Sequence, residues 1–179
     1  MAAPPRKKFK IVVAGPFSAG KSQFIATASA LRSFRTETTI SDETAFEKQH
    51  TTVAMDFGRV DYDGKALYLF GTPGQERFEF MWKILTVGMH GLLIIVDATD
   101  LAGAKDAVAI ANYYQERYNV PILVCANKQD LSYARTPDQM YAALDLPRTI
   151  PLLPLIARDP RTVRLVCNRI LKETENWLY

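Results

Sequence analysis

The stretch GPFSAGKS at residues 15–22 constrains the fold most, because it directly follows the apolar run IVVA. It fits the pattern Gly15-x-x-x-x-Gly20-Lys21-Ser22, a phosphate-binding loop that needs a strand before it and a helix after it. Small residues let backbone N–H groups point at phosphate oxygens, aided by the positive end of the helix. In such loops the lysine neutralises the β- and γ-phosphates and the serine hydroxyl binds Mg²⁺. We therefore expect a phosphate site here, with an ordinary glycine-rich turn as the alternative.

Strand-like and helical patterns alternate along the rest of the chain. Apolar, β-branched runs that are typical of strands buried on both faces lie at residues 9–14, 91–97 and 120–126. Helical patterns lie at residues 21–31 and 102–118. Residues 53–70 predict two more strands, joined by a turn at Asp63-Gly64. The order predicts a three-layer α/β fold: a mostly parallel central sheet with one antiparallel edge hairpin and helices on both faces.

Two further helices are predicted near the C-terminus from their start signals. Thr136-Pro137-x-Gln139 places an N-cap, a first-turn proline and a capping-box glutamine in order. Asp159-Pro160 begins the last helix in the same way. Its apolar face is predicted to comprise Val163, Val166, Cys167, Ile170, Leu171 and Thr174. Residues 149–156 contain two prolines, which favours a short or edge strand.

Length and composition indicate one globular domain. We expect residues 9–179 to form it, after a flexible basic arm at residues 1–8. The net charge of +3 does not favour nucleic-acid binding. Cys125 and Cys167 are expected to pack as small hydrophobes rather than form a disulfide. We find no membrane-spanning run, signal segment or lipidation motif in the sequence, so we expect a cytoplasmic protein without a membrane anchor.

A second motif, Asn127-Lys128-Gln129-Asp130, follows the strand predicted at 120–126. The carboxylate of Asp130 can accept hydrogen bonds from the N1–H and the amino group of guanine. Adenine offers neither donor, so it would leave a buried carboxylate without a partner. The stem of Lys128 can cover the base, and Asn127 can tie this loop to the phosphate loop. A chance polar loop is the alternative, but its place after a strand favours guanine recognition.

A third stretch, GTPGQERF at residues 71–78, follows the predicted hairpin. With the phosphate loop, the threonines at 51–52 and Asn-Lys-x-Asp in this order, the chain resembles the Ras-like small GTPases from about residue 9 to 177. The segments TTVAMDFG and FGTPGQERF resemble those of small GTPases of the prokaryotic MglA-like and conservon-associated branch. The resemblance implies a P-loop G-domain that binds GTP and GDP with Mg²⁺.

The resemblance also implies roles for single residues. Thr52 would reach Mg²⁺ when a γ-phosphate is present, with Thr51 as the second choice; Gly74 would sense that phosphate. Gln75 would orient the attacking water, or it is a surface residue without a catalytic role. Ala157 would contact the base, with Arg158 beside it. The expected nucleotide contacts are Gly15, Ser18, Ala19, Gly20, Lys21, Ser22, Gln23, Thr52, Gly74, Asn127, Lys128, Asp130, Ala157 and Arg158; the metal ligands are Ser22 and Thr52, and the catalytic residues are Gln75 and Lys21.

The chain departs from the family pattern in three places. Gly71 stands where the family usually has an aspartate that holds Mg²⁺ through water. Asp56 or Asp97 could replace it, although for Asp97 a capping or loop-supporting role is favoured. Phe17 puts bulk into the phosphate loop, where it could obstruct an arginine finger. No arginine directly precedes Thr52; the nearby candidates for such a cation are Arg35, Lys48 and Arg59.

These features predict a Mg²⁺-dependent GTP/GDP switch with slow, partner-stimulated hydrolysis and two switch loops, at about 35–58 and 71–88. The resemblance implies a roadblock-type, MglB-like activating partner and an effector at these loops. The alternatives are a nucleotide-dependent binding module without measurable hydrolysis and a P-loop kinase that uses ATP. Phe78, Met81, Trp82 and Leu85 recur at helical spacing, which favours packing of a switch helix over a partner patch. His50 and His90 are expected to be structural.

Overall fold

The computed structural model describes residues 7–31, 56–62, 64–73 and 79–179. In this part of the chain a sheet of six strands has the order β2-β3-β1-β4-β5-β6. The strands are β1 (Lys7–Ala14), β2 (Asp56–Tyr62), β3 (Lys65–Gly71), β4 (Gly91–Asp97), β5 (Ile122–Asn127) and β6 (Leu152–Pro154). Only the β2–β3 pair in this sheet is antiparallel. The predicted mostly parallel sheet with one antiparallel edge hairpin is confirmed.

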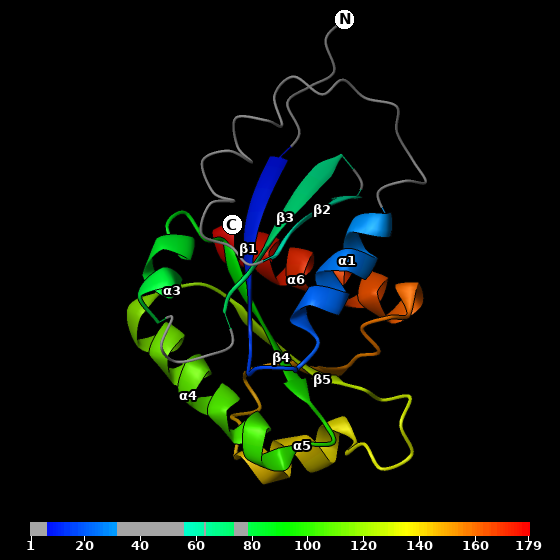
Figure 1. Cartoon of the computed structure of the whole chain (residues 1–179). Helices are drawn as coiled ribbons and strands as arrows, with labels where there is room; N and C mark the ends of the chain where they lie inside the picture. Colours follow the sequence, from blue (N-terminus) through cyan, green and yellow to red (C-terminus); the bar gives the residue numbers. More distant parts are fainter. Residues whose placement is uncertain (1–6, 32–55, 63, 74–78) are drawn as a thin grey trace, which may run out of the picture.

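Helices cover both faces of the sheet (Figure 1). Described helices are α1 (Lys21–Ala30), α3 (Glu79–Leu85), α4 (Leu101–Arg117), α5 (Pro137–Leu144) and α6 (Pro160–Leu178). Side chains of α1 and α6 pack on one face, and those of α3, α4 and α5 on the other. The structure therefore has the predicted three layers.

The middle strands explain why the core has two halves. Successive residues of β1 point to opposite faces, so Ile11 and Val13 join the core under α1 and α6, whereas Val12 and Ala14 join the core under α3 and α4. All residues of β5 are likewise buried. Runs that are apolar at every position therefore form strands covered on both sides, as the sequence predicts.

The local start signals are confirmed where the structure describes them. The backbone N–H of Thr136 donates to Gln139 Oε1 at 2.9 Å, and that of Gln139 donates to Thr136 Oγ1 at 3.3 Å, which is a complete capping box. The carboxylate of Asp159 accepts from the N–H of Arg161. β6 is a three-residue edge strand. β1 begins at Lys7, inside the segment predicted as a flexible arm.

Several predicted packing roles are also confirmed. Cys125 and Cys167 are buried free thiols, and burial raises the pKa of Cys167 to about 12. Trp82 and Leu85 of α3 are buried; Phe78 of the same stripe lies outside the described residues. In the described part of the chain, no helix is both long and apolar enough to cross a membrane.

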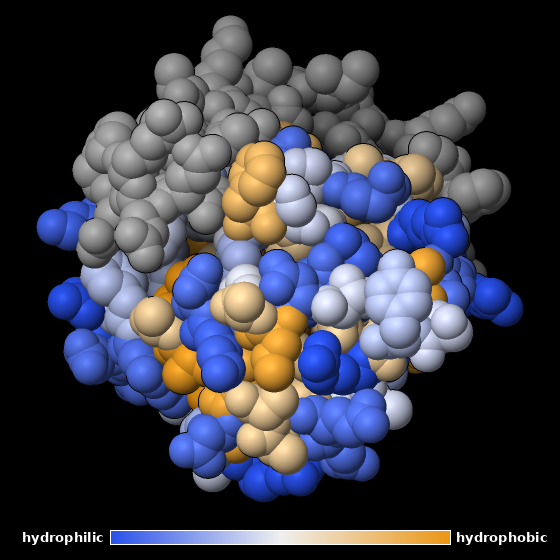
Figure 2. Space-filling model, turned by 60° about the horizontal axis from the view of Figure 1, so that its bottom comes forward, coloured by the Kyte–Doolittle hydropathy of each residue, from blue (hydrophilic) through white to orange (hydrophobic). Residues whose placement is uncertain are grey.

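The carboxyl ends of β1, β4 and β5 gather at the lower end of the sheet in Figure 1. Open α/β sheets bind their ligands at this end. Figure 2 turns the lower end forward, and there hydrophilic side chains surround a smaller group of hydrophobic ones. The predicted motifs follow these strands, so the fold brings them to one end of the molecule.

Candidate functional site

The phosphate loop between β1 and α1 needs both of its glycines. Gly15 has φ 146°, and a Cβ on it would lie 2.1 Å from the carbonyl oxygen of Ile95 in β4. Gly20 has φ 105°, and a Cβ on it would lie 2.2 Å from the side-chain nitrogen of Asn127. Residues other than glycine rarely adopt such φ values. Both glycines are thus explained by close approach of neighbouring strands and loops, apart from any ligand.

Lys21, the first residue of α1, folds back into this loop. Its Nζ donates to the carbonyl oxygens of Gly15, at 2.8 Å, and Pro16, at 2.7 Å. Burial lowers the pKa of Lys21 to about 8, and the carboxylate of Asp56 opposes that shift. Phe17, by contrast, is 72% exposed at the outer edge of the loop. The loop therefore encloses a cation and presents an aromatic ring to solvent.

Asn127, at the end of β5, joins three loops. Its Nδ2 donates to the carbonyl oxygen of Ala19 at 2.9 Å, and its Oδ1 accepts from the N–H of Ala157 at 2.9 Å. Asn127 and Ala157 are buried, so both bonds are shielded from water. The amide holds the phosphate loop, the loop after β5 and the loop after β6 together. The predicted tie between Asn127 and the phosphate loop is confirmed.

The two charged residues that follow Asn127 have different partners. Lys128 has φ 69°, and its Nζ lies 2.5 Å from Asp97 Oδ2 at the end of β4. Asp97 also accepts from the N–H and the hydroxyl of Thr99. These bonds hold the pKa of Asp97 below its usual range, although its burial acts in the opposite direction. Asp97 supports the loop, which is the role that the sequence favours for it.

Asp130, the residue predicted to recognise the base, is paired across the two loops. Its Oδ2 lies 2.5 Å from Nη2 of Arg158, in the loop after β6. The side chain of Asp130 is 25% exposed, and that of Arg158 is 73% exposed. The predicted neighbours Asp130 and Arg158 are thus brought together. Their ion pair was not predicted, because nothing in the local pattern of either loop indicates the other.

A second carboxylate lies beside the phosphate loop. The hydroxyl of Ser22 donates to Asp56 Oδ2 at 2.5 Å. Asp56 begins β2 and is the register partner of Gly71 at the end of β3. A Cβ on Gly71 would lie 3.0 Å from Ile25 Cδ1 and 3.2 Å from the Cβ of Asp56. A side chain at residue 71 would therefore be in tight contact with Ile25 of α1 and with Asp56.

The pairing of residues 56 and 71 has a signal in the sequence. A two-residue turn pairs the residues equally distant from it, and Asp63-Gly64 lies midway between Asp56 and Gly71. Gly64 has φ 73°, as such a turn requires. Between the two carboxylates considered as replacements, the contact with Ser22 favours Asp56.

The other site residues are placed as follows. Gln23 is exposed on the first turn of α1, where its amide donates to Thr27 Oγ1 at 3.1 Å. Arg59 is 6% exposed and is paired with Asp61, so it is a poor candidate for an arginine finger. His90 accepts from the N–H of Lys10, a structural contact. The predictions on Arg35, Lys48, His50, Thr51, Thr52, Gly74 and Gln75 lie outside the described residues.

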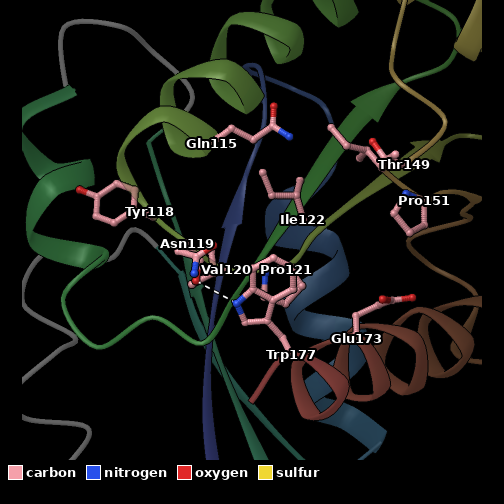
Figure 3. Close-up of a pocket in the computed structure, with 11 residues that line it drawn as sticks. Gln115, Tyr118, Asn119, Val120, Pro121, Ile122, Thr149, Pro151, Glu173 and Trp177 are labelled. Atoms are coloured by element: carbon pink, nitrogen blue, oxygen red, sulfur yellow. Dashed lines mark hydrogen bonds between the residues drawn. The ribbon is translucent and has the colours of Figure 1, made fainter. Parts of the chain in front are cut away.

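A pocket of about 530 Å³ lies at the opposite end of the sheet (Figure 3). Its lining includes Ile122 at the start of β5, Pro151 just before β6, and Trp177 near the end of α6. The indole N–H of Trp177 donates to the carbonyl oxygen of Asn119 at 3.1 Å. None of the lining residues belongs to the candidate site. This pocket is thus separate from the loops described above.

Similar proteins place the chain among nucleotide-binding proteins. It is 29% identical over 126 residues to an uncharacterised protein of Methanocaldococcus jannaschii, across 70% of this chain and 73% of that protein. It is 30% identical over 138 residues to ADP-ribosylation factor-related protein 1 of Homo sapiens, and 30% identical over 129 residues to ADP-ribosylation factor-like protein 3 of Saccharomyces cerevisiae. Each alignment with these two covers 70% of this chain and 62% of the relative, so the chain spans less than two thirds of their length.

These relatives support the predicted kinship with Ras-like small GTPases through the ADP-ribosylation factor group, and they give no support to the MglA-like branch. A family profile described as "Conserved hypothetical ATP binding protein" matches residues 13–172. The matched region runs from β1 into α6 and contains both the phosphate loop and Asn127-Lys128-Gln129-Asp130. Because it takes in most of the chain, this protein belongs to the family of conserved hypothetical ATP-binding proteins.

Proposed function

We propose that this protein is a Mg²⁺-dependent GTP/GDP switch that hydrolyses GTP slowly and is stimulated by a partner. The observation that carries this proposal is the pair of hydrogen bonds made by the side-chain amide of Asn127. It accepts from the N–H of Ala157 and donates to the carbonyl oxygen of Ala19. It holds a phosphate loop and a base-recognition loop in one fixed arrangement. A nucleotide spans such a pair of loops, with its phosphates in one and its base in the other.

Guanine is the base that the loop after β5 fits best. A carboxylate that is one-quarter exposed, as Asp130 is, accepts two hydrogen bonds from guanine and none from adenine. Ala157, a small buried residue, lies in the adjoining loop after β6, where its N–H donates to Asn127. The name of the family mentions ATP, and an ATP-using enzyme is therefore the rival that the experiment below must exclude.

We assign the whole of residues 9–179 to one G-domain in the cytoplasm.

The residues beside the phosphate loop fit a magnesium ion. Ser22 offers a hydroxyl and Asp56 a carboxylate on the same side of α1, and oxygen donors of this kind suit Mg²⁺. Ser22 and Thr52 would bind the ion, and Asp56 would accept from its waters in place of the missing carboxylate at Gly71. When bound, Mg²⁺ supplies positive charge beside the β- and γ-phosphates.

The protein's own groups suffice for slow hydrolysis. Gln75 would orient the attacking water, and Lys21 would neutralise charge on the transferred phosphate. The alternative for Gln75 remains a surface role. An arginine finger is typically worth about 10³–10⁵ in rate, and Arg59 is held in β2 by Asp61. A partner at the switch loops, about 35–58 and 71–88, would therefore supply the missing charge; a roadblock-type, MglB-like protein is the candidate, and an effector would use the same loops.

One experiment separates the three possible activities. The nucleotide released from the purified protein is identified by chromatography, and the turnover of GTP and of ATP is then measured side by side, for the parent and for Gln75→Ala. We expect bound GDP or GTP, slow GTP turnover and a further loss in Gln75→Ala. GTP binding without any turnover would favour the non-hydrolysing module, whereas preferential ATP turnover would overturn the proposal.

A further inference from the structure

The ion pair between Arg158 and Asp130 is an intrinsic feature of the two loops that form the predicted base site. The loop after β5 and the loop after β6 are bonded through their backbones: the N–H of Gln129 donates to the carbonyl oxygen of Leu155 at 3.2 Å, and that of Leu155 donates to Ala126 at 2.9 Å. The Asn127 amide adds its bond to Ala157, next to Arg158. The backbones that carry both charged side chains are therefore fixed, and only the side chains are free to move.

Arg158 is the cation that forms an ion pair with Asp130. Lys128, two residues before Asp130, is directed to Asp97 instead. Within the residues that the structure describes, Arg158 is thus the one cation for which an ion pair with Asp130 is found. Its guanidinium lies 2.5 Å from Oδ2, one of the two oxygens that guanine would use.

This pair changes the energy of base selection in two ways. Guanine must displace Arg158 from Oδ2 or share that oxygen with it, which weakens guanine binding. Adenine, which has no donors for Asp130, would normally leave the carboxylate without a partner, and that is costly in a partly buried site. With Arg158 present the carboxylate keeps a partner, so adenine incurs less of this cost.

We propose that Arg158 is a specificity-setting residue that narrows the preference of this site for guanine over adenine by acting through Asp130. The inference rests on the proposed recognition of the base by Asp130. It gives Arg158 a role different from direct contact with the base. Because Arg158 is mostly exposed, the pair is weak, and its effect is expected to be about two- to fivefold.

The test is a competition between GDP and ADP for the purified full chain, which is expressed as the ratio of their dissociation constants. The two nucleotides differ only in the base, so contributions from phosphate and metal cancel in this ratio. Arg158→Ala is expected to raise the preference for GDP about two- to fivefold, and Arg158→Lys, which keeps the charge, should stay near the parent. Arg161→Ala is the matched control, because Arg161 is an exposed arginine that pairs with Asp159 at the start of α6.

Salt gives a second readout that a merely structural role of Arg158 would not move. Exposed ion pairs are screened by salt. The preference of the parent for GDP should therefore rise with ionic strength, whereas that of Arg158→Ala should stay constant.

The outcomes separate this inference from the proposed function. If Arg158→Ala weakens both nucleotides equally and leaves the ratio unchanged, Arg158 does not set the preference between the bases and the inference is overturned. If Asp130→Asn removes the GDP preference but Arg158→Ala leaves it at the parent's value, only this inference fails. If the ratio responds to neither change, or if neither nucleotide binds, the proposed base recognition fails and the inference falls with it.

Discussion

The two halves of the proposed nucleotide site are held together in different ways. In the base half, the loops after β5 and β6 are linked by backbone hydrogen bonds and by the buried amide of Asn127. In the metal half, Ser22 of α1 meets Asp56 of β2 through one hydrogen bond between side chains. A network of buried backbone bonds fixes geometry, whereas a single contact between partly exposed side chains is easily exchanged. The base half is thus built to stay fixed, and the metal half can change its contacts.

The largest effect is expected in the base half, at Asp130. Asp130→Asn replaces a charged acceptor by an amide that offers one acceptor oxygen, so one charge-assisted bond to guanine is lost. Such a bond is worth about 1.5–3 kcal/mol, and GDP and GTP should bind about 10- to 100-fold more weakly, as measured by calorimetry or with a fluorescent nucleotide. Asp138→Asn, at an exposed carboxylate on α5, is the control. Unchanged affinity in Asp130→Asn would show that this residue does not recognise the base.

The next effect concerns the carboxylate of the metal half. Loss of a group that orients metal-bound waters typically costs about 10- to 100-fold in metal affinity. Asp56→Asn should therefore raise the Mg²⁺ concentration needed for GTP binding by about that factor. Gly71→Asp should not improve on the parent, because its new side chain would crowd Ile25 and the Cβ of Asp56.

Asp97→Asn is the control for this titration, since Asp97 is bound to Thr99 and Lys128. A shifted Mg²⁺ curve in Asp97→Asn together with a normal curve in Asp56→Asn would reverse the assignment. Normal curves in all three variants would mean that no carboxylate supports the metal.

In both halves the sequence predicts the elements but not every contact between them. The capping box at Thr136, the hairpin around Gly64 and the buried strands follow from local turn chemistry and from the period of apolar residues, so they were predictable. The link between Asn127 and the phosphate loop was also predictable, because both motifs follow parallel strands whose carboxyl ends lie at the same end of the sheet. The meeting of Ser22 with Asp56 depends on how α1 packs on the hairpin, and the Arg158–Asp130 pair depends on two loops far apart in the chain. Neither contact has a local pattern that indicates it.

A smaller effect would show whether the metal half changes with the nucleotide. Thr52→Ala should weaken Mg²⁺–GTP binding about fivefold, because the loss of one polar contact costs about 1 kcal/mol. Mg²⁺–GDP binding should weaken less. The reason is that only the triphosphate state would draw this hydroxyl to the metal. Dissociation rates of the two nucleotides at saturating Mg²⁺ provide the measurement. Equal losses for both would remove Thr52 from the switch and favour Thr51.

The smallest effect concerns the anchor between the sheet and the segment that follows α3. Lys10 of β1 is 2% exposed, its Nζ donates to the carbonyl oxygen of Val87 at 2.7 Å, and it lies over the ring of Phe70. Burial lowers the pKa of Lys10 to about 8. The burial of Lys10 in β1 was not predicted, because it depends on this distant segment.

Lys10 makes the stability of the protein depend on pH. Between pH 8 and its usual pKa of 10.5, the unfolded chain holds more protons at this site than the folded one, so the free energy of unfolding rises with pH. Urea unfolding should therefore show a gain from pH 7.5 to 9, and Lys10→Met should reduce that gain by about 1 kcal/mol or less. The control Lys105→Met, on the exposed side of α4, should show the same gain as the parent. Burial raises the pKa of both cysteine thiols above their usual value of 9.0, so their ionisation in the unfolded chain begins within this range and reduces the gain equally in the parent and in both variants. The same gain in Lys10→Met as in the parent would show that Lys10 is not the titrating anchor.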